Sequence, residues 1–120
     1  MSKVAAWAVL VLGFAHIVFG IARFQVPILQ AVSEGFVGRW MMPEIRRTAF
    51  WFIICGPMFM LAGHAAIRAV DTGDSYLLRL IGTYMLIASL VGVAAFPRSP
   101  LWAPLLLSLP LIAAGLGWLD

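Results

Sequence analysis

Long apolar runs divide this sequence and restrict the folds that it can adopt. The first covers residues 4–22, the second covers 49–66, and two more extend over about 76–96 and 100–119. A helix over the first run would be roughly 28 Å long, close to the hydrocarbon thickness of a bilayer at about 30 Å. Apolar residues make up 63% of the chain and charged residues 11%, whereas a soluble domain is roughly half apolar and a quarter charged. The sequence therefore predicts an integral membrane protein.

The same composition excludes several other classes of protein. A soluble chain of 120 residues would bury only about two-thirds of its surface, too little to hide this apolar content. The one cysteine cannot form a disulfide within the chain. The net charge is +3, but the arginines stand at the ends of the apolar runs, where cationic side chains meet lipid headgroups. No nucleic-acid partner is expected.

Start and stop signals flank the apolar runs. Pro43 suits the first position of a helix, and Gly73 suits its end. Ser75 is a candidate N-cap, the third run ends before Pro97, and Pro110 should kink the fourth. We predict one all-α domain over residues 1–120, a transmembrane four-helix bundle with helices at about 4–24, 43–70, 75–96 and 100–119.

Small residues recur at helical spacing on three of these spans. Such faces let membrane helices approach closely, and packing then drives their association. This pattern favours a compact bundle and is also compatible with a homo-oligomer. The glycines concerned are Gly13, Gly20, Gly56, Gly63, Gly82 and Gly92.

The connection between the first two spans, residues 23–48, is too long for a simple turn. Ile28, Leu29, Val32 and Phe36 form an apolar stripe at helical spacing. We therefore predict a short amphipathic helix over about 28–36 that lies in the membrane interface and covers a site as a lid.

Four spans place the first and third connections on one side of the membrane. Five arginines lie on that side, against three cationic residues on the other side. The positive-inside rule therefore favours a cytoplasmic position for the first connection.

Several catalytic and cofactor motifs are missing from the sequence. It contains no C-x-x-C, H-E-x-x-H or G-x-S-x-G pattern and no glycine-rich nucleotide loop. Two histidines without clustered carboxylates predict no metal site. His16 and His64 would differ in depth by about 15 Å along antiparallel helices, whereas one haem needs both at the same level. No cofactor is therefore expected.

The remaining polar residues gather on the side of the first connection. A histidine within an apolar span usually faces other helices or a wet cavity, which makes His16 a candidate floor for a pocket. An interhelical hydrogen bond from His16 to Ser89, Thr83 or a carbonyl freed by Pro110 is the simpler interpretation. Lipid anchoring is the simpler interpretation for Arg46, Arg47 and Arg98. The candidate ligand-binding residues are Arg23, Arg39, Arg47, Trp51, Tyr84 and Arg98, and the candidate acid–base residues are His16, Glu34 and Glu44.

Three functions follow from this arrangement. The first is binding of a lipid, quinone, isoprenoid or other amphiphile between the helices, with its polar head near the arginines. The second is a cofactor-free isomerase or cyclase that uses His16 with Glu34 or Glu44 as acid and base. The third is an accessory or structural subunit whose glycine faces pack onto a partner.

Three stretches of this sequence also carry a family resemblance. They are the string from Gly13 to Gly20, the string from Arg46 to Phe52, and Phe96-Pro97-Arg98-Ser99-Pro100. Together with the glycines of the second and third spans, they resemble a family of small bacterial four-span membrane proteins of unknown function. The resemblance covers nearly the whole chain. It implies a multi-pass protein of the bacterial cytoplasmic membrane, and it implies no activity.

Overall fold

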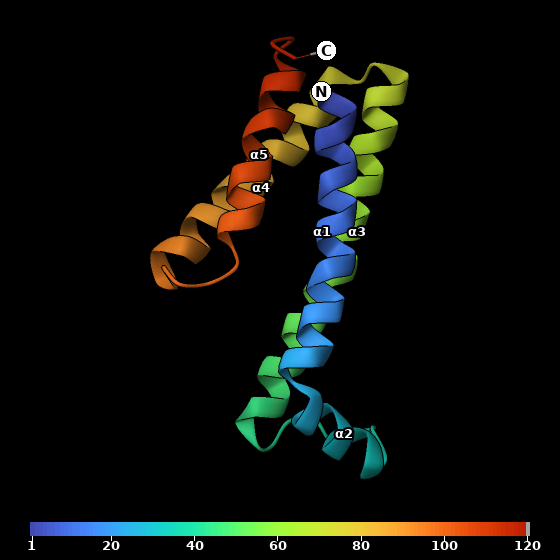
Figure 1. Cartoon of the computed structure of the whole chain (residues 1–120), viewed down its shortest axis with the longest axis vertical. Helices are drawn as coiled ribbons and strands as arrows, with labels where there is room; N and C mark the ends of the chain where they lie inside the picture. Colours follow the sequence, from blue (N-terminus) through green and yellow to red (C-terminus); the bar gives the residue numbers. More distant parts are fainter. Residues whose placement is uncertain (120) are drawn as a thin grey trace.

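The computed structural model describes residues 1–119, which contain five helices and no strand. Three of the helices are long: α1 (Ser2–Arg23), α3 (Glu44–Thr72) and α4 (Ser75–Ala95). Two are short: α2 (Gln25–Ser33) and α5 (Trp102–Gly115). The molecule is elongated, 51 × 28 × 20 Å, with α2 at one end and the N-terminus at the other (Figure 1).

Helices α1, α3 and α4 are long and apolar enough to cross a membrane. Their lengths of about 33, 43 and 31 Å match or exceed the hydrocarbon core of about 30 Å. Helix α5 is apolar but has only 14 residues, which corresponds to about 21 Å. Large apolar side chains such as Val18, Leu61 and Val91 are exposed along the long helices, as expected of surfaces that face lipid.

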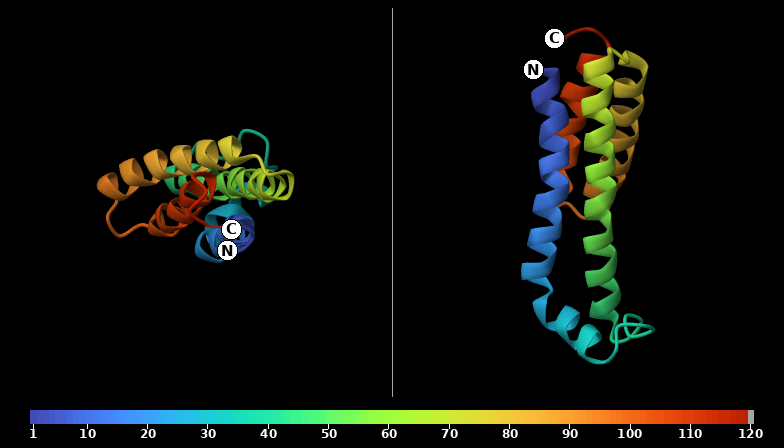
Figure 2. Two further views of the ribbon diagram at one scale, coloured as in Figure 1. Left: turned by 90° about the horizontal axis from the view of Figure 1, so that it is seen from above. Right: turned by 90° about the vertical axis from the view of Figure 1, so that its right-hand side faces the viewer.

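The helices form two pairs, α1 with α3 and α4 with α5 (Figure 1). Within each pair the two helices are in contact over most of the shorter one, which is α1 in the first pair and α5 in the second. The two pairs meet near the N-terminus of α1, and the α4–α5 turn ends partway along α1 and α3, which continue to α2 (Figures 1 and 2). The predicted all-α fold is confirmed. The helices do not form a bundle that is compact along its whole length.

Glycines permit the close approach within each pair. A Cβ on Gly13 would lie 2.7 Å from the backbone nitrogen of Met60, and a Cβ on Gly63 would lie 2.6 Å from the Cα of Leu10. On the other pair, a Cβ on Gly82 would lie 3.0 Å from the backbone nitrogen of Ile112. The glycine faces predicted from the sequence are therefore used within this chain.

At the end near the N-terminus, which we call the packed end, the three long helices and α5 meet. Small and medium side chains fill the space between them, and Ala6, Val9, Ala66 and Leu111 are fully buried. An exposed ion pair between Lys3 and Asp71 (3.0 Å) closes this end. The core cluster consists of Ala5, Ala6, Val9, Ala66, Ala69, Leu78, Met85, Leu111 and Ala114.

Helix boundaries agree with the sequence signals to within a few residues, with local differences. Gly73 ends α3 in the left-handed conformation (φ 70°), as predicted. The cap of α4 is Asp74 rather than Ser75, because the Asp74 carboxylate accepts a hydrogen bond from Leu77 N (3.0 Å). Helix α5 covers Trp102–Gly115 rather than 100–119.

The first connection contains the predicted short helix, displaced toward the N-terminus. Helix α2 begins at Gln25 rather than near 28, directly after α1, since Pro27 is tolerated in a first helical turn. It ends at Ser33 because Gly35 and Phe36 adopt positive φ angles (112° and 67°) that reverse the chain.

Candidate functional site

A cavity of about 780 Å³ lies between the two helix pairs, on the side away from the packed end. It is mostly apolar, with a few polar side chains. Helix α1 and helix α3 form one wall, and the α4–α5 turn with the first residues of α5 forms the other. The lining residues are Leu12, Ala15, His16, Phe19, Glu44, Arg47, Thr48, Trp51, Phe52, Cys55, Phe59, Ser99, Pro100, Leu101, Ala103 and Pro104.

His16 lies in this wall, half-buried, and is held by α3. Its ring stacks on Phe52 (centroids 4.0 Å apart, interplanar angle 14°) and meets the edge of Phe59 at 5.7 Å. Its Nε2 is 2.7 Å from the carbonyl oxygen of Phe52. A carbonyl oxygen only accepts hydrogen bonds, so Nε2 carries the proton and the neutral ring keeps Nδ1 as an acceptor.

The hydrogen bond of His16 confirms the interhelical contact expected from the sequence, with a different acceptor. The acceptor lies one turn before Pro57 of α3, not near Pro110 of α5. A proline inside a helix leaves the carbonyl four residues earlier without its helical donor and disturbs the surrounding turn. Pro57 frees the carbonyl of Ile53 and therefore points to this turn of α3, but it does not identify the Phe52 carbonyl as the acceptor.

Glu44 and Arg47 form the polar end of the cavity. Both are in the first turn of α3, and their side chains form an i,i+3 pair at 3.8 Å. The Glu44 side chain is 83% exposed and that of Arg47 is 46% exposed, so the pair is weak. Glu44 is eight residues before Phe52, which places it about 12 Å along α3 from the level of His16.

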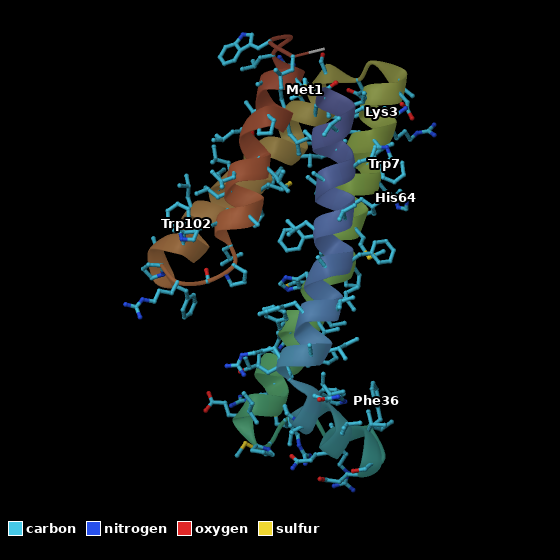
Figure 3. All side chains as sticks on the ribbon, viewed as in Figure 1. Met1, Lys3, Trp7, Phe36, His64 and Trp102 are labelled. Atoms are coloured by element: carbon cyan, nitrogen blue, oxygen red, sulfur yellow. The ribbon has the colours of Figure 1, made fainter. Side chains whose placement is uncertain are left out.

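The α4–α5 turn supplies the opposite wall. Ser99 lines the cavity, and its Oγ is buried without a hydrogen-bond partner in residues 1–119. The turn is held by a hydrogen bond from Trp102 Nε1 to the carbonyl oxygen of Pro97 (2.8 Å). Figure 3 places Trp102 on this second wall, while Trp7 and His64 lie toward the packed end.

A second cluster ties the first connection to α3. Arg46 is buried and donates to both carboxylate oxygens of Glu34 and to the carbonyl oxygen of Arg39 (3.0 Å). The hydrogen bonds from Arg46 hold the pKa of Glu34 below its usual value. Lipid anchoring was therefore the wrong interpretation of Arg46, which pairs with Glu34.

The structure brings four of the predicted residues to the cavity: His16, Glu44, Arg47 and Trp51. The others lie outside it. Glu34 is engaged by Arg46, Arg23 stacks over the Phe24 ring at 5.5 Å, and Tyr84 is 69% exposed. The side chains of Arg39 and Arg98 are also exposed. The predicted lid does not cover the site, because no residue of α2 lines the cavity.

The sequence argument missed the aromatic and apolar part of the wall. Phe52, Phe59 and Leu101 line the cavity, and the two phenylalanines also hold His16. Phe52 and Phe59 are seven residues apart, two helical turns, on the face of α3 that also carries Thr48 and Cys55. That periodicity could have identified this face once Glu44 was taken as its first polar residue.

Fold and cavity together define an all-α protein with three helices long enough to cross a membrane and a cavity between two helix pairs. The chain belongs to a family of unknown function (DUF6463), whose model matches residues 1–117. No curated protein and no solved structure matches the chain.

Proposed function

We propose that this chain is a multi-pass protein of the bacterial cytoplasmic membrane, and that it binds a lipophilic or amphiphilic molecule between its two helix pairs. The observation that carries the proposal is the cavity of about 780 Å³. Its size falls within the range of small-molecule sites, roughly 300–1,000 Å³, and such sites are mostly apolar with a few placed polar groups.

Four membrane crossings are part of this proposal. Helices α1, α3 and α4 are long enough to cross, and α5 is about 21 Å long, so its connection to α4 would lie within the depth of the bilayer. Irregular backbone is tolerated at that depth only where protein buries it or where it lines a wet cavity. Ser99, Pro100 and Leu101 of this turn line the cavity.

The positions of the polar groups favour an amphiphile. Glu44 and Arg47 lie in the first turn of α3, where a headgroup would be solvated, and His16 lies deeper by about 12 Å. Between them the wall consists of Phe19, Trp51 and Phe52. The ligand would place its charged head at Arg47, its apolar part along the aromatic wall, and a hydrogen-bond donor at Nδ1 of His16.

The test is native mass spectrometry of the protein extracted in mild detergent, with a variant that fills the cavity. Ala15 lines the cavity, and Ala15→Phe should reduce the fraction of chains carrying a lipophilic adduct about tenfold. Ala94→Phe is the matched control, since Ala94 is exposed on α4 and does not line the cavity. Absence of any adduct from the wild type, or equal occupancy in Ala15→Phe, would overturn the proposal.

A second candidate is a cofactor-free isomerase or cyclase at the same site. It is favoured by His16, which lines the cavity and donates from Nε2 to the carbonyl oxygen of Phe52, because a neutral imidazole then keeps Nδ1 as a base. Glu44 is about 12 Å away along α3, too far to act on the same bond. Conversion of the bound molecule that persists in both His16→Ala and Glu44→Gln would exclude this candidate.

The glycine faces argue against a purely accessory subunit. Met60 fills the space beside Gly13, Leu10 fills the space beside Gly63, and Ile112 fills the space beside Gly82. These faces are therefore used inside the chain and are not free to recruit a partner subunit or a second copy.

A further inference from the structure

A second pocket, of about 310 Å³, adjoins the main cavity. Arg47 and Trp51 line both pockets and separate them. The other lining residues of the smaller pocket come from the first connection and from α3: Gly38, Trp40, Met41 and Phe50. A molecule that occupies both pockets would therefore pass over Arg47 and meet its guanidinium group.

Trp40 lines the smaller pocket and carries an unpaired hydrogen-bond donor. Its Nε1 is buried and has no acceptor among residues 1–119. Phe36 meets the indole at 5.5 Å and Phe50 meets it at 5.7 Å, so the ring is fixed on two sides. An indole N–H can only donate, and a buried donor without an acceptor is destabilising. A ligand that offers an acceptor there would remove this penalty.

The charge of the pocket comes from Arg47, whose situation differs from that of Arg46. Arg46 is engaged by Glu34 and by the carbonyl oxygen of Arg39. Arg47 has a single weak partner, Glu44, at 3.8 Å. A guanidinium group has five N–H donors and remains protonated, so Arg47 has donors available for an anion.

We propose that the smaller pocket binds the phosphate head of an amphiphile whose chain occupies the main cavity. This inference rests on the proposed function and deepens it by naming the class of headgroup. A phosphate monoester offers three terminal oxygens, enough for two bonds from the fork of Arg47 and one from Trp40 Nε1. Met41, Phe50 and Trp51 form the apolar walls of this pocket, beside which the methylene groups next to the phosphate would pack.

The test compares probes that share a chain and differ in the head. Dodecyl phosphate, dodecanol, dodecanoate and inorganic phosphate are titrated calorimetrically against the purified protein in an uncharged detergent. We expect dodecyl phosphate to bind about tenfold or more tightly than dodecanol, because hydrogen bonds to a charged group are the stronger ones. It should also bind more tightly than dodecanoate, because a carboxylate has two oxygens and a phosphate monoester has three for the same donors. Inorganic phosphate should bind far more weakly than dodecyl phosphate. Equal affinities for inorganic phosphate and dodecyl phosphate would overturn the amphiphile in favour of a free anion.

Two variants test whether the smaller pocket causes the preference for a phosphate head. Trp40→Phe removes the N–H and keeps an aromatic ring, and Arg47→Gln removes the charge. Each should lower the affinity for dodecyl phosphate relative to that for dodecanol about tenfold, and retained dodecanol binding shows that the variant is folded. Glu44→Gln should raise the affinity for dodecyl phosphate, since it frees Arg47. Trp7→Phe, near the packed end (Figure 3), is the matched control and should have no effect.

Two failures are distinguishable. If dodecanol binds and Ala15→Phe blocks it, but Trp40→Phe and Arg47→Gln leave the ratio of phosphate to alcohol affinity unchanged, the headgroup site is wrong and the cavity remains. If neither dodecanol nor dodecyl phosphate binds, the proposed function fails together with this inference.

Discussion

The packed end and the cavity end of this molecule are built from the same helices but from different side chains. At the packed end, alanines and glycines of α1, α3 and α5 let the helices come together, and Ala6, Ala66 and Leu111 are fully buried. At the cavity end, the wall carries Phe19, Phe52 and Phe59. Helices with small side chains can approach until their backbones touch, whereas bulky aromatic faces need a partner of complementary shape.

Small side chains favour a closed core at the packed end, and aromatic side chains favour a cavity at the other end. Between α4–α5 and α1–α3, contact at the packed end is dry and apolar, while the cavity end contains His16, Arg47 and Ser99. Polar side chains in an apolar span are retained where they have partners. Of the three, only Ser99 has no hydrogen-bond partner among residues 1–119, while His16 bonds to Phe52 and Arg47 pairs with Glu44. A ligand in the cavity would supply a partner for Ser99.

The largest effect is expected from a methyl group on Gly63. Its Cβ would meet the backbone of Leu10 at 2.6 Å, and a backbone cannot rotate away. Gly63→Ala should lower the free energy of unfolding by about 1–3 kcal/mol, the usual range for overpacking. Thermal unfolding in mild detergent, followed by circular dichroism, measures it.

Gly92→Ala, at the cavity end, is the matched control for that variant. The side chain of Leu101 faces Gly92 and can change rotamer, and alanine favours a helix by about 1 kcal/mol over glycine. This variant should be neutral or more stable. Equal losses in Gly63→Ala and Gly92→Ala would mean that the two ends do not differ in packing.

The sequence predicted the helices well and their arrangement less well. Pro43, Gly73 and Pro97 act locally, through backbone angles and missing donors, so the boundaries they imply lie within a few residues of those observed. The divergence of the helix pairs depends on which faces fit each other. This fit depends on the surfaces of two helices together, so the glycine spacing along one helix does not predict it.

The next effect is expected in the first connection, at Arg46. Its side chain joins Glu34 and the carbonyl oxygen of Arg39, so Arg46→Ala leaves both acceptors without their donor. Hydrogen exchange of the amides of residues 35–42 should become about tenfold faster, as for the loss of a hydrogen bond to a charged group. Arg47→Ala is the control, because its ion pair with Glu44 is exposed. Equal acceleration in both variants would contradict the role of Arg46.

A smaller effect is expected from pH, at the same contact. Because Arg46 lowers the pKa of Glu34 in the folded chain, their interaction stabilises fully above the usual glutamate pKa. The stabilisation is lost as pH falls through the lowered value. Exchange of the amides of residues 35–42, corrected for its intrinsic pH dependence, should accelerate as pH falls below the usual glutamate value of about 4.3. Glu34→Gln should remove this dependence, and a dependence that persists would assign it to another group.

For the site, the sequence located the polar groups but not their partners. The clustering of ionisable residues near the first connection predicted a site in this part of the molecule, and His16, Glu44, Arg47 and Trp51 line the cavity. Arg46 and Arg47 are the same residue type and are adjacent in sequence. A sequence argument therefore assigns both side chains nearly the same depth in the membrane. Only the direction of each side chain around α3 gives one a structural contact and leaves the other at the cavity, and direction depends on how α3 is rotated against the first connection.

The smallest effect on stability is expected at His16, and it separates the two ends most directly. His16→Phe keeps an aromatic ring to stack on Phe52 and loses only the hydrogen bond to the Phe52 carbonyl oxygen. Interhelical hydrogen bonds in membranes contribute about 0.6 kcal/mol on average, so the loss in thermal stability should be near that value. At the packed end, a substitution of this kind would act through packing alone. At the cavity end, it should also change which molecules co-purify with the protein, because Nδ1 is removed from the wall. A stability loss as large as that of Gly63→Ala, with an unchanged adduct, would make His16 a packing residue and not a ligand contact.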